Sequence, residues 1–377
     1  MGAMPAEKKP PALRIRALDW HRGLAVLAMV ECHALLLLHR SHEHEPLRQF
    51  LNSINGLIAP SFIFAAGFAL ALTSCRSAVD PQGRRERAVK TLMRIGEVLV
   101  VSSLLKWMLW PVRTEPWQWL RIDVLSCIGY SLLALWACVF SLGNRPRTVA
   151  AAMAGAATLI FTLAPWTESL RDLGVLQFFV NNKSGSEFPV LPWAGYGFIG
   201  ASLGALVSIP DRGARYLWVH LAITFSAGVA IANAGGLWDR IYPWSPWIFQ
   251  NAGERIWKVA AIALALRGAE AFGASHGWAM KNPLTKFLEH FGLNSLSGYF
   301  AQACILFGKW IALPFGLSFG ITGFTRWAGQ FHWTGFWLLT IVAIAGTGAF
   351  CWAWNFLDPH LPWRKQARKP EPAARPA

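Results

Sequence analysis

Charged and titratable side chains cluster around one apolar run near the N-terminus. They are Asp19, His21 and Arg22, just before the run 23–38, and Glu31 and His33 inside it. Arg22 and His33 are eleven residues apart, so a helix would place them on one face with roughly 16 Å of rise between them. Asp19 falls near that face, whereas Glu31 points nearly opposite to Arg22.

The spacing of Arg22 and His33 suggests a long ligand with a charged head and a slender thioester arm. The guanidinium would hold the head, and the imidazole, near the middle of the run, would meet the reactive end. Imidazole suits proton transfer because its unperturbed pKa is close to neutrality. Two plainer interpretations stay open: Arg22 extends to lipid headgroups, and His33 makes a structural hydrogen bond between helices.

A second group of imidazoles follows the apolar run. His39, His42 and His44 alternate with Glu43 and Glu45. Both residue types are zinc ligands, but the spacing is loose and a solvated polar loop is the simpler interpretation, so we predict no metal site. A catalytic base at this surface is the third alternative.

A dense group of cations lies farther along the chain, between the second and third apolar runs. It comprises Arg84, Arg85, Arg87, Lys90 and Arg94, of which the last two share a helix face. Membrane topology and lipid contact explain such a group, and a phosphate-rich head such as that of coenzyme A would also bind it.

The elements that must position these residues are membrane helices. Of the 377 residues, 54% are hydrophobic and 15% are charged, with a mean hydropathy of +0.35, whereas soluble domains carry about 25% charge. The 21 tryptophans fit membrane interfaces. The composition excludes a disordered chain and, with six cysteines, a disulfide scaffold. We therefore predict an all-α, polytopic integral membrane helical bundle.

We predict about ten transmembrane helices, since a span needs about 20 residues. They cover 23–38, 57–72, 92–110, 122–142, 149–164, 189–209, 216–234, 256–272, 291–311 and 334–356. The chain would comprise a basic N-terminal segment (1–22), a transmembrane domain (23–356) and a disordered tail (357–377).

The distribution of positive charge predicts the orientation. Of the 35 lysines and arginines, 23 fall in segments on the side of the termini, so both termini are expected in the cytoplasm and the bundle in the cytoplasmic (inner) membrane. The basic charge then serves topology and contact with anionic lipids. We predict no nucleic-acid partner.

Five segments resemble, in order, motifs of transmembrane acyltransferases. The likeness is greatest to the bacterial relatives of heparan-alpha-glucosaminide N-acetyltransferase. The segments are 16–25 with Met29 and His33, 59–67, 123–130, 188–196 with Gly200 and Gly204, and 291–296 with Tyr299. Two positions depart from the family's pattern. Asn55 and Gly56 stand where an aspartate is common, and a late histidine is replaced near Gln302.

The resemblance implies transfer of an acetyl group from acetyl-CoA to an amine or hydroxyl of a sugar or glycan, at or across the membrane. It implies His33 or His44 as the catalytic histidine, with His42 next after His44. Candidates for binding the coenzyme are Arg22, Arg87, Lys90 and Arg94. Candidates for contact with the substrate are Glu31, Trp193, Asn294, Ser295 and Tyr299.

Other interpretations stay open beside the enzyme. Trp193 and the pair Gly200 and Gly204 also fit helix packing, because small residues four apart let helices approach closely. A transporter of sugars or lipid-linked glycans would use the same buried polar residues without bond making. Inverted repeats would favour it, and the sequence shows none. A structural scaffold and a homo-oligomer are also left open.

Overall fold

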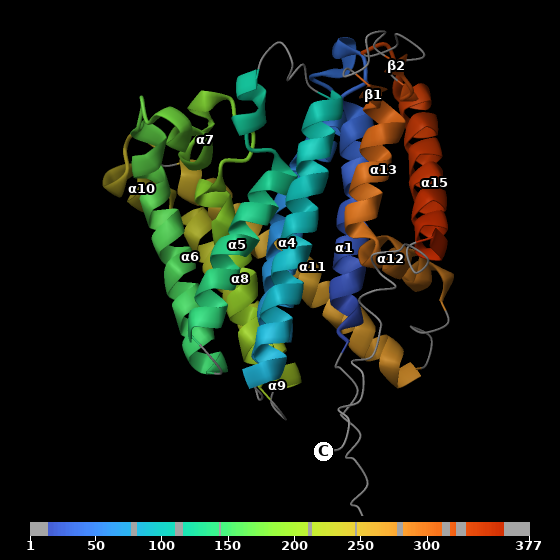
Figure 1. Ribbon diagram of the computed structural model, residues 1–377. Coiled ribbons are helices and arrows are strands. Elements are labelled where there is room, and N and C mark those ends of the chain that lie inside the picture. Colours follow the sequence, from blue (N-terminus) through green and yellow to red (C-terminus); the bar gives the residue numbers. More distant parts are fainter. Residues whose placement is uncertain are drawn as a thin grey trace, which may run out of the picture.

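The computed structural model describes residues 14–76, 81–109, 116–142, 145–209, 213–245, 247–276, 282–310, 317–321 and 329–357. These residues form a helical bundle with one short antiparallel hairpin, β1 (Lys309–Trp310) and β2 (Leu317–Ser318) (Figure 1). Most of the predicted N-terminal segment and tail lies outside the described residues.

Each predicted span contains a helix. The ten helices are α1 (Arg16–Leu35), α3 (Ile58–Arg76), α4 (Pro81–Leu109), α5 (Val124–Leu142), α6 (Pro146–Ser169), α8 (Val190–Val207), α9 (Gly213–Asn233), α11 (Trp247–His276), α13 (Ser295–Phe307) and α15 (Trp333–Leu357). Shorter elements connect them: η1 (Arg40–His42), α2 (Pro46–Asn55), η3 (Pro116–Leu120), η4 (Gly174–Leu176), α7 (Gln177–Val180), η5 (Asn182–Ser184), α10 (Gly235–Ile241) and α12 (Pro283–Leu293). The all-α prediction is confirmed, apart from the hairpin.

Six segments are long and apolar enough to cross a membrane by length and composition. They are α2 with α3 (Pro46–Arg76), α5, α6, α8, most of α9 (Arg215–Asn233) and α15. The helices α1, α4 and α11 carry charged residues along their length, and α13 has 13 residues. The chain is a multi-pass membrane protein by this measure, and the count of ten spans stays a prediction.

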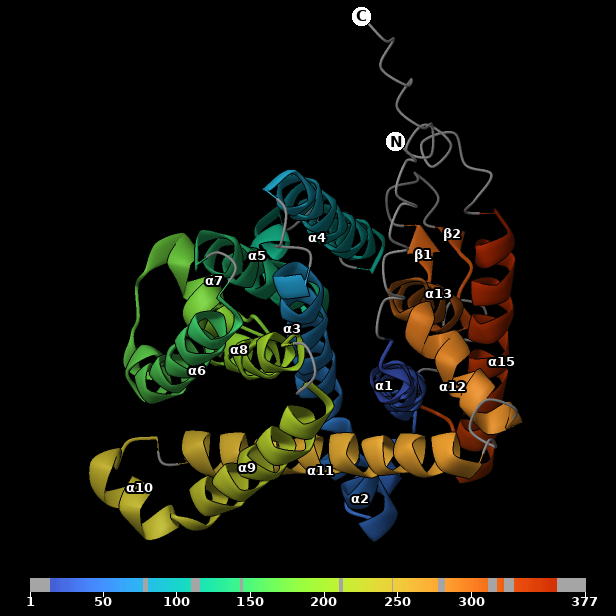
Figure 2. The ribbon, with the colours of Figure 1, turned by 90° about the horizontal axis from the view of Figure 1, so that it is seen from below.

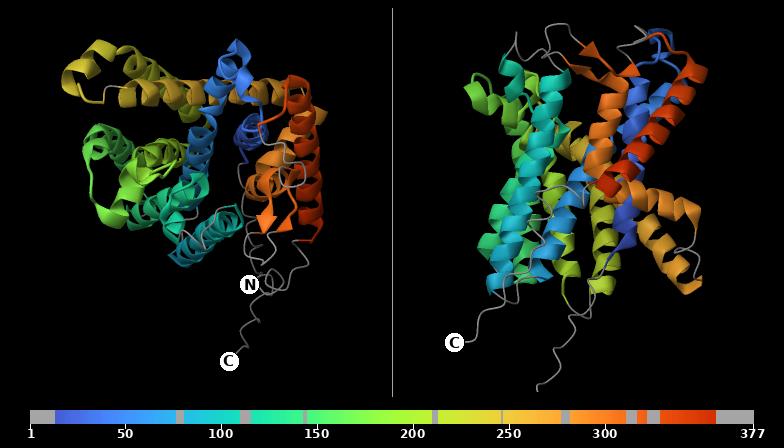
Figure 3. Two further views of the ribbon diagram at one scale, coloured as in Figure 1. Left: turned by 90° about the horizontal axis from the view of Figure 1, so that it is seen from above. Right: turned by 45° about the vertical axis from the view of Figure 1, so that its right-hand side comes forward.

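The helices form two groups (Figures 2 and 3). One holds α3, α4, α5, α6 and α8, and the other holds α1, α12, α13 and α15. The long helix α11 runs obliquely across one face of both groups, with α9 packed on it. Because α1 also packs on α3, it lies where the two groups meet.

Glycines allow the closest helix contacts. A Cβ atom on Gly200 of α8 would lie 2.1 Å from the Phe64 carbonyl oxygen of α3, and one on Gly204 would lie 2.2 Å from that of Phe68. The packing interpretation of these two glycines is therefore confirmed. In the other group, Gly23 of α1 meets the backbone of Leu288 in α12 in the same way, which fixes α1 against its neighbours.

Candidate functional site

Arg22 lies near the start of α1 and is half-buried. Its Nη2 atom donates a hydrogen bond to the Ala65 carbonyl oxygen of α3, at 3.1 Å. The guanidinium is thus held between α1 and α3. A guanidinium has five N–H donors. Among the described residues, Ala65 is the only hydrogen-bond acceptor that Arg22 contacts, which leaves donors for a ligand.

The charges around Arg22 favour an anion. Asp19 attracts its guanidinium and Arg94 of α4 repels it. Asp19, however, is already bound by Arg14, whose Nε atom lies 2.8 Å from the carboxylate. That hydrogen bond and the carboxylate charge raise the pKa of Arg14 above its usual value. Arg22 and Arg94 are thus two neighbouring cations, and the Asp19 carboxylate that acts on Arg22 is shared with Arg14.

The remaining cations predicted to bind the coenzyme lie on α4. Arg87, Lys90 and Arg94 fall within about 60° of one another around the helix, at about 100° per residue. Lys90 forms an ion pair with Glu86, one turn earlier on the exposed surface. Of the three, Arg94 is the one that acts on Arg22.

His33 lies in the last turn of α1, not in the middle of a span. The helix begins at Arg16 and ends at Leu35, earlier at both ends than the predicted run 23–38. The Nδ1 atom of His33 lies 2.8 Å from Oε1 of Gln302 in α13. The rings of Tyr299 and Phe307 stand edge-on to the imidazole, with centroids 6.2 and 5.9 Å away.

The partner of His33 selects its tautomer. Gln302 is fully buried, and its Nε2 atom donates to the Tyr299 carbonyl oxygen at 3.2 Å, which turns the amide oxygen toward His33. An amide oxygen only accepts hydrogen bonds, so Nδ1 carries the imidazole proton. The lone pair then resides on Nε2, which is the atom able to take a proton or attack a carbonyl carbon.

The predicted substrate residues do not gather at one point. Tyr299 contacts the His33 ring. Glu31 lies on another side of α1, near Asn55 at the end of α2. Asn294 lies between α12 and α13, and its Nδ2 atom donates to the His290 carbonyl oxygen of α12 at 2.8 Å.

Two more of these candidates sit apart from His33. Ser295 begins α13, directly after the junction with α12. Trp193 of α8 belongs to an aromatic group with Phe188 and Tyr196, at centroid distances of 4.9 and 6.0 Å. The Arg255 guanidinium lies over its ring at 5.0 Å. Both aromatic rings and the guanidinium that contact Trp193 thus come from the protein itself.

The histidines that follow α1 have different environments. His44 is exposed, and its carbonyl oxygen accepts a hydrogen bond from Gln49. His42 is held by Glu45 and by His332, a residue 290 positions later in the chain. Of the two histidines predicted here, His42 is the one with polar partners on its ring.

The described residues contain no group of three or more His, Cys, Asp or Glu side chains arranged to hold a metal ion. His42 and His332 instead face each other with ring nitrogens 2.9 Å apart, which is a hydrogen-bond distance.

Sequence reasoning missed several polar residues. Gln302 and His332 meet histidines of the N-terminal part, and such long-range contacts leave no local spacing. A third residue, Lys106, could have been found from the sequence. Lys106 stands inside the run 92–110, and any ionisable residue in a span is a candidate by default.

In the structure Lys106 belongs to a buried polar network. Its Nζ atom donates to Oγ of Ser126 at 2.8 Å, and Ser102 links Ser126 to Asp123. Lys106 and Asp123 are 4% and 8% exposed, so this network compensates two buried charges.

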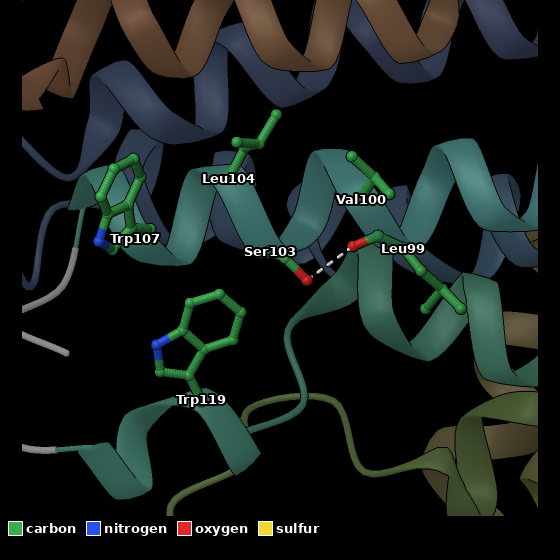
Figure 4. Close-up of a pocket in the computed structure, with 6 residues that line it drawn as sticks. All are labelled: Leu99, Val100, Ser103, Leu104, Trp107 and Trp119. Carbon is green, nitrogen blue, oxygen red and sulfur yellow. Dashed lines mark hydrogen bonds between the residues drawn. The ribbon is translucent and has the colours of Figure 1, made fainter.

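An open pocket lies on the outward face of α4 (Figure 4). Leu99, Val100, Ser103, Leu104 and Trp107 of α4 line it, together with Trp119 of η3. Its one hydroxyl group, on Ser103, donates to the Leu99 carbonyl oxygen. The lining residues that the structure describes are apolar or aromatic apart from Ser103, so they offer contact to apolar chains.

Comparison with known proteins adds one finding. Residues 14–227 match the family model described as "Heparan-alpha-glucosaminide N-acetyltransferase, catalytic". The match includes Arg22, His33, His42 and the cations of α4, whereas Gln302 and His332 lie beyond it. No curated protein matches the chain.

Proposed function

The chain belongs to the heparan-alpha-glucosaminide N-acetyltransferase catalytic family, and we propose that it transfers an acetyl group from acetyl-CoA to an amine or hydroxyl of a sugar. The family supports acyl transfer at a membrane in general. The observation that carries the proposal is the position of His33, which follows Arg22 by about three helical turns on α1 and whose Nδ1 atom is bound by Gln302. An acetyl-CoA molecule whose phosphates are bound at Arg22 would present its thioester to His33.

The donor would lie along α1. Arg22 and Arg94 would bind the phosphates of coenzyme A through charge-assisted hydrogen bonds, and Arg87 and Lys90 extend the basic surface of α4. From there the slender arm would run toward His33, over a rise of roughly 16 Å.

His33 would act as the base and then as the acid. Its Nε2 atom takes the proton from the sugar nucleophile as that atom attacks the thioester carbonyl carbon. The carbon–sulfur bond then breaks, and the imidazolium returns the proton to the leaving thiolate. Gln302 supports the charged ring by accepting the Nδ1 proton, and Tyr299 closes one side of the imidazole.

The proposed orientation places the cation end of α1 in the cytoplasm, where acetyl-CoA is made, with ten spans in the cytoplasmic membrane. The excess of lysines and arginines on the side of the termini supports it. A reporter protein that is active only in the cytoplasm, fused after Ala377, should be active. Export of that reporter would contradict the orientation.

The test of the reaction uses the purified protein in lipid vesicles. We expect release of the coenzyme A thiol from acetyl-CoA that depends on glucosamine, together with formation of N-acetylglucosamine. Uptake of labelled glucosamine into the vesicles without acetylation would instead identify a transporter. Absence of both thiol release and acetylated product with amine and hydroxyl acceptors would overturn the enzyme proposal.

A further inference from the structure

Three polar side chains form a chain of hydrogen bonds at the end of the bundle where α1 ends and α15 begins. Nδ1 of His42 lies 2.7 Å from Oε1 of Glu45, and Nε2 of His42 lies 2.9 Å from Nδ1 of His332. The indole nitrogen of Trp333 donates to the other oxygen of Glu45, at 2.6 Å. We call Glu45, His42 and His332 the histidine chain.

The hydrogen bonds fix the direction of the histidine chain. Hydrogen bonds from His42 and Trp333 lower the pKa of Glu45, so this carboxylate stays ionised and only accepts. Neutral His42 therefore carries its proton on Nδ1 and accepts, at Nε2, the Nδ1 proton of His332. The lone pair at the far end belongs to Nε2 of His332.

His42 is the most covered of the three side chains. It is 13% exposed, whereas the side chain of Glu45 is 43% exposed and His332 is an exposed residue. A proton taken up at Nε2 of His332 can be relayed, because the Nδ1 proton of His332 moves to Nε2 of His42 and the positive charge comes to rest beside Glu45. This is the arrangement of an imidazole base that is oriented and charge-stabilised by a carboxylate.

The histidine chain adjoins the surroundings of His33. The backbone nitrogen of His39 donates to the Phe331 carbonyl oxygen at 2.8 Å, which ties the segment after α1 to the one before α15. Phe307, which stands against the His33 ring, belongs to the same apolar cluster as Phe331 and Trp333. Phe331 and Trp333 flank His332 in the sequence. His33 and the histidine chain therefore lie at the same end of the bundle.

An amine acceptor must lose one more proton than His33 transfers. An amino sugar is partly to largely protonated at neutral pH, and its ammonium form has no lone pair to attack a thioester. It must lose two protons to become an amide. His33 passes one of them to the leaving thiolate, and the other must leave the site. A hydroxyl acceptor has only the first of these two protons to lose.

We propose that the histidine chain removes the first proton from an ammonium acceptor, with Nε2 of His332 as the atom that takes it and Glu45 and His42 as positioning residues. The inference rests on the proposed acetyl transfer, taken with an amine acceptor of the kind that the description of the matched family prints, and it adds the route of the first proton. The proton balance closes, because an ammonium ion and a thioester give an amide, a thiol and one released proton. That released proton leaves through the histidine chain.

The first experiment measures acetylation of glucosamine by the full-length protein in lipid vesicles. His332→Ala and Glu45→Gln should lower kcat at neutral pH by about ten- to a hundred-fold. The loss should shrink as the pH rises above the pKa of the acceptor amine, since the free amine no longer needs the base. Added imidazole should restore part of the activity of His332→Ala.

The matched control is His39→Asn. The His39 ring lies 5.7 Å from that of His332, but its Nδ1 atom accepts the Ser41 backbone proton at the start of η1. Asparagine can keep that cap, so this variant should retain wild-type kcat at every pH.

A second measurement needs no catalysis. Diethyl pyrocarbonate acylates accessible unprotonated imidazole nitrogens, and peptide mass spectrometry locates the product. We expect modification of His332 and protection of His42 in the wild-type protein, and modification of His42 once His332→Ala uncovers its Nε2 atom. Modification of His42 in the wild-type protein would overturn the geometry of the histidine chain.

The remaining outcomes separate the two proposals. Acetylation by the wild-type protein that is unchanged in both variants would overturn the histidine chain and leave the acetyl transfer intact. Loss of activity that is equal at all pH values, without rescue by imidazole, would assign these residues a structural role and also overturn it. A wild-type protein that never releases thiol would overturn both.

Discussion

The two ends of α1 hold their functional side chains in different ways. At the Arg22 end the contacts are ionic and many. Arg14 binds Asp19, and Arg16 reaches Glu289 of α12 at 3.2 Å, while Arg22 itself meets a backbone carbonyl oxygen of α3. At the His33 end the contacts are few and neutral, since one amide oxygen and two aromatic rings surround the imidazole.

This difference matches the task proposed for each end. Phosphates need positive charge with donors left over, and small displacements of a guanidinium cost little there. Proton transfer needs one lone pair in one direction, so a single buried acceptor decides the tautomer of His33. Substitutions at the His33 end should therefore change the rate of the reaction, and those at the Arg22 end should change the affinity for the donor.

The largest effect is expected at His33. His33→Ala removes the proposed base, so kcat should fall by about 10²–10⁴-fold with little change in the affinity for acetyl-CoA. Thiol release measured at saturating glucosamine gives kcat, and calorimetry gives the affinity. His33→Gln keeps a hydrogen-bonding side chain but has no basic nitrogen, and it should be as impaired as His33→Ala. Activity retained in His33→Gln would identify a packing role.

His44 provides the internal comparison for that experiment. The resemblance to the family favours this residue, whereas the structure leaves its side chain exposed. If His44→Ala abolishes transfer while both His33 variants remain active, the chemistry belongs to the loop after α1, and the contrast between the two ends of α1 fails.

These two histidines also show what a sequence can and cannot predict. Periodicity and composition located a helix in each of the ten spans, because an apolar run specifies a helix locally. The same local reasoning found Arg22 and His33 on one face of one helix. It missed Gln302 and His332, because their partners lie 269 and 290 residues away, and only the packing of α13 and α15 against α1 creates those contacts.

The second expected effect concerns the donor. Arg22→Ala should weaken acetyl-CoA binding about ten-fold or more, since hydrogen bonds to charged groups contribute about 1.5–3 kcal/mol each. The value of kcat at saturating donor should change much less. Calorimetric titration with coenzyme A measures the affinity directly.

Arg147→Ala is the matched control for Arg22→Ala. It removes the same charge from an exposed position near the start of α6, away from α1. Equal loss of affinity in both variants would show a general effect of net charge, and unchanged affinity in Arg22→Ala would remove this residue from the donor site.

A smaller effect is expected at Gln302. Gln302→Met keeps the length and burial of the side chain but removes the oxygen that accepts the Nδ1 proton. A neutral hydrogen bond contributes about 0.5–1.5 kcal/mol, so kcat should fall by up to about ten-fold, and the affinity for coenzyme A should stay the same. The nitrogen chemical shifts of labelled His33 should report a mixture of tautomers. A single Nδ1-protonated form in this variant would show that Gln302 does not set the tautomer.

The smallest catalytic effect is expected at Asn294, although the sequence predicts it as a substrate residue. Its Nδ2 atom is already bound to the His290 carbonyl oxygen, and the residue is 8% exposed, so the amide has a structural partner at the junction of α12 and α13. Asn294→Ala should lower the free energy of unfolding by about 1 kcal/mol and leave kcat and the affinity for acetyl-CoA unchanged. Thermal unfolding and thiol release on the same preparation measure both. A loss of kcat greater than ten-fold in a variant that stays folded would move Asn294 into the reaction. The acceptor site would then extend from His33 along α13 to Ser295. The junction of α12 and α13 would in that case take part in the reaction together with the His33 end of α1.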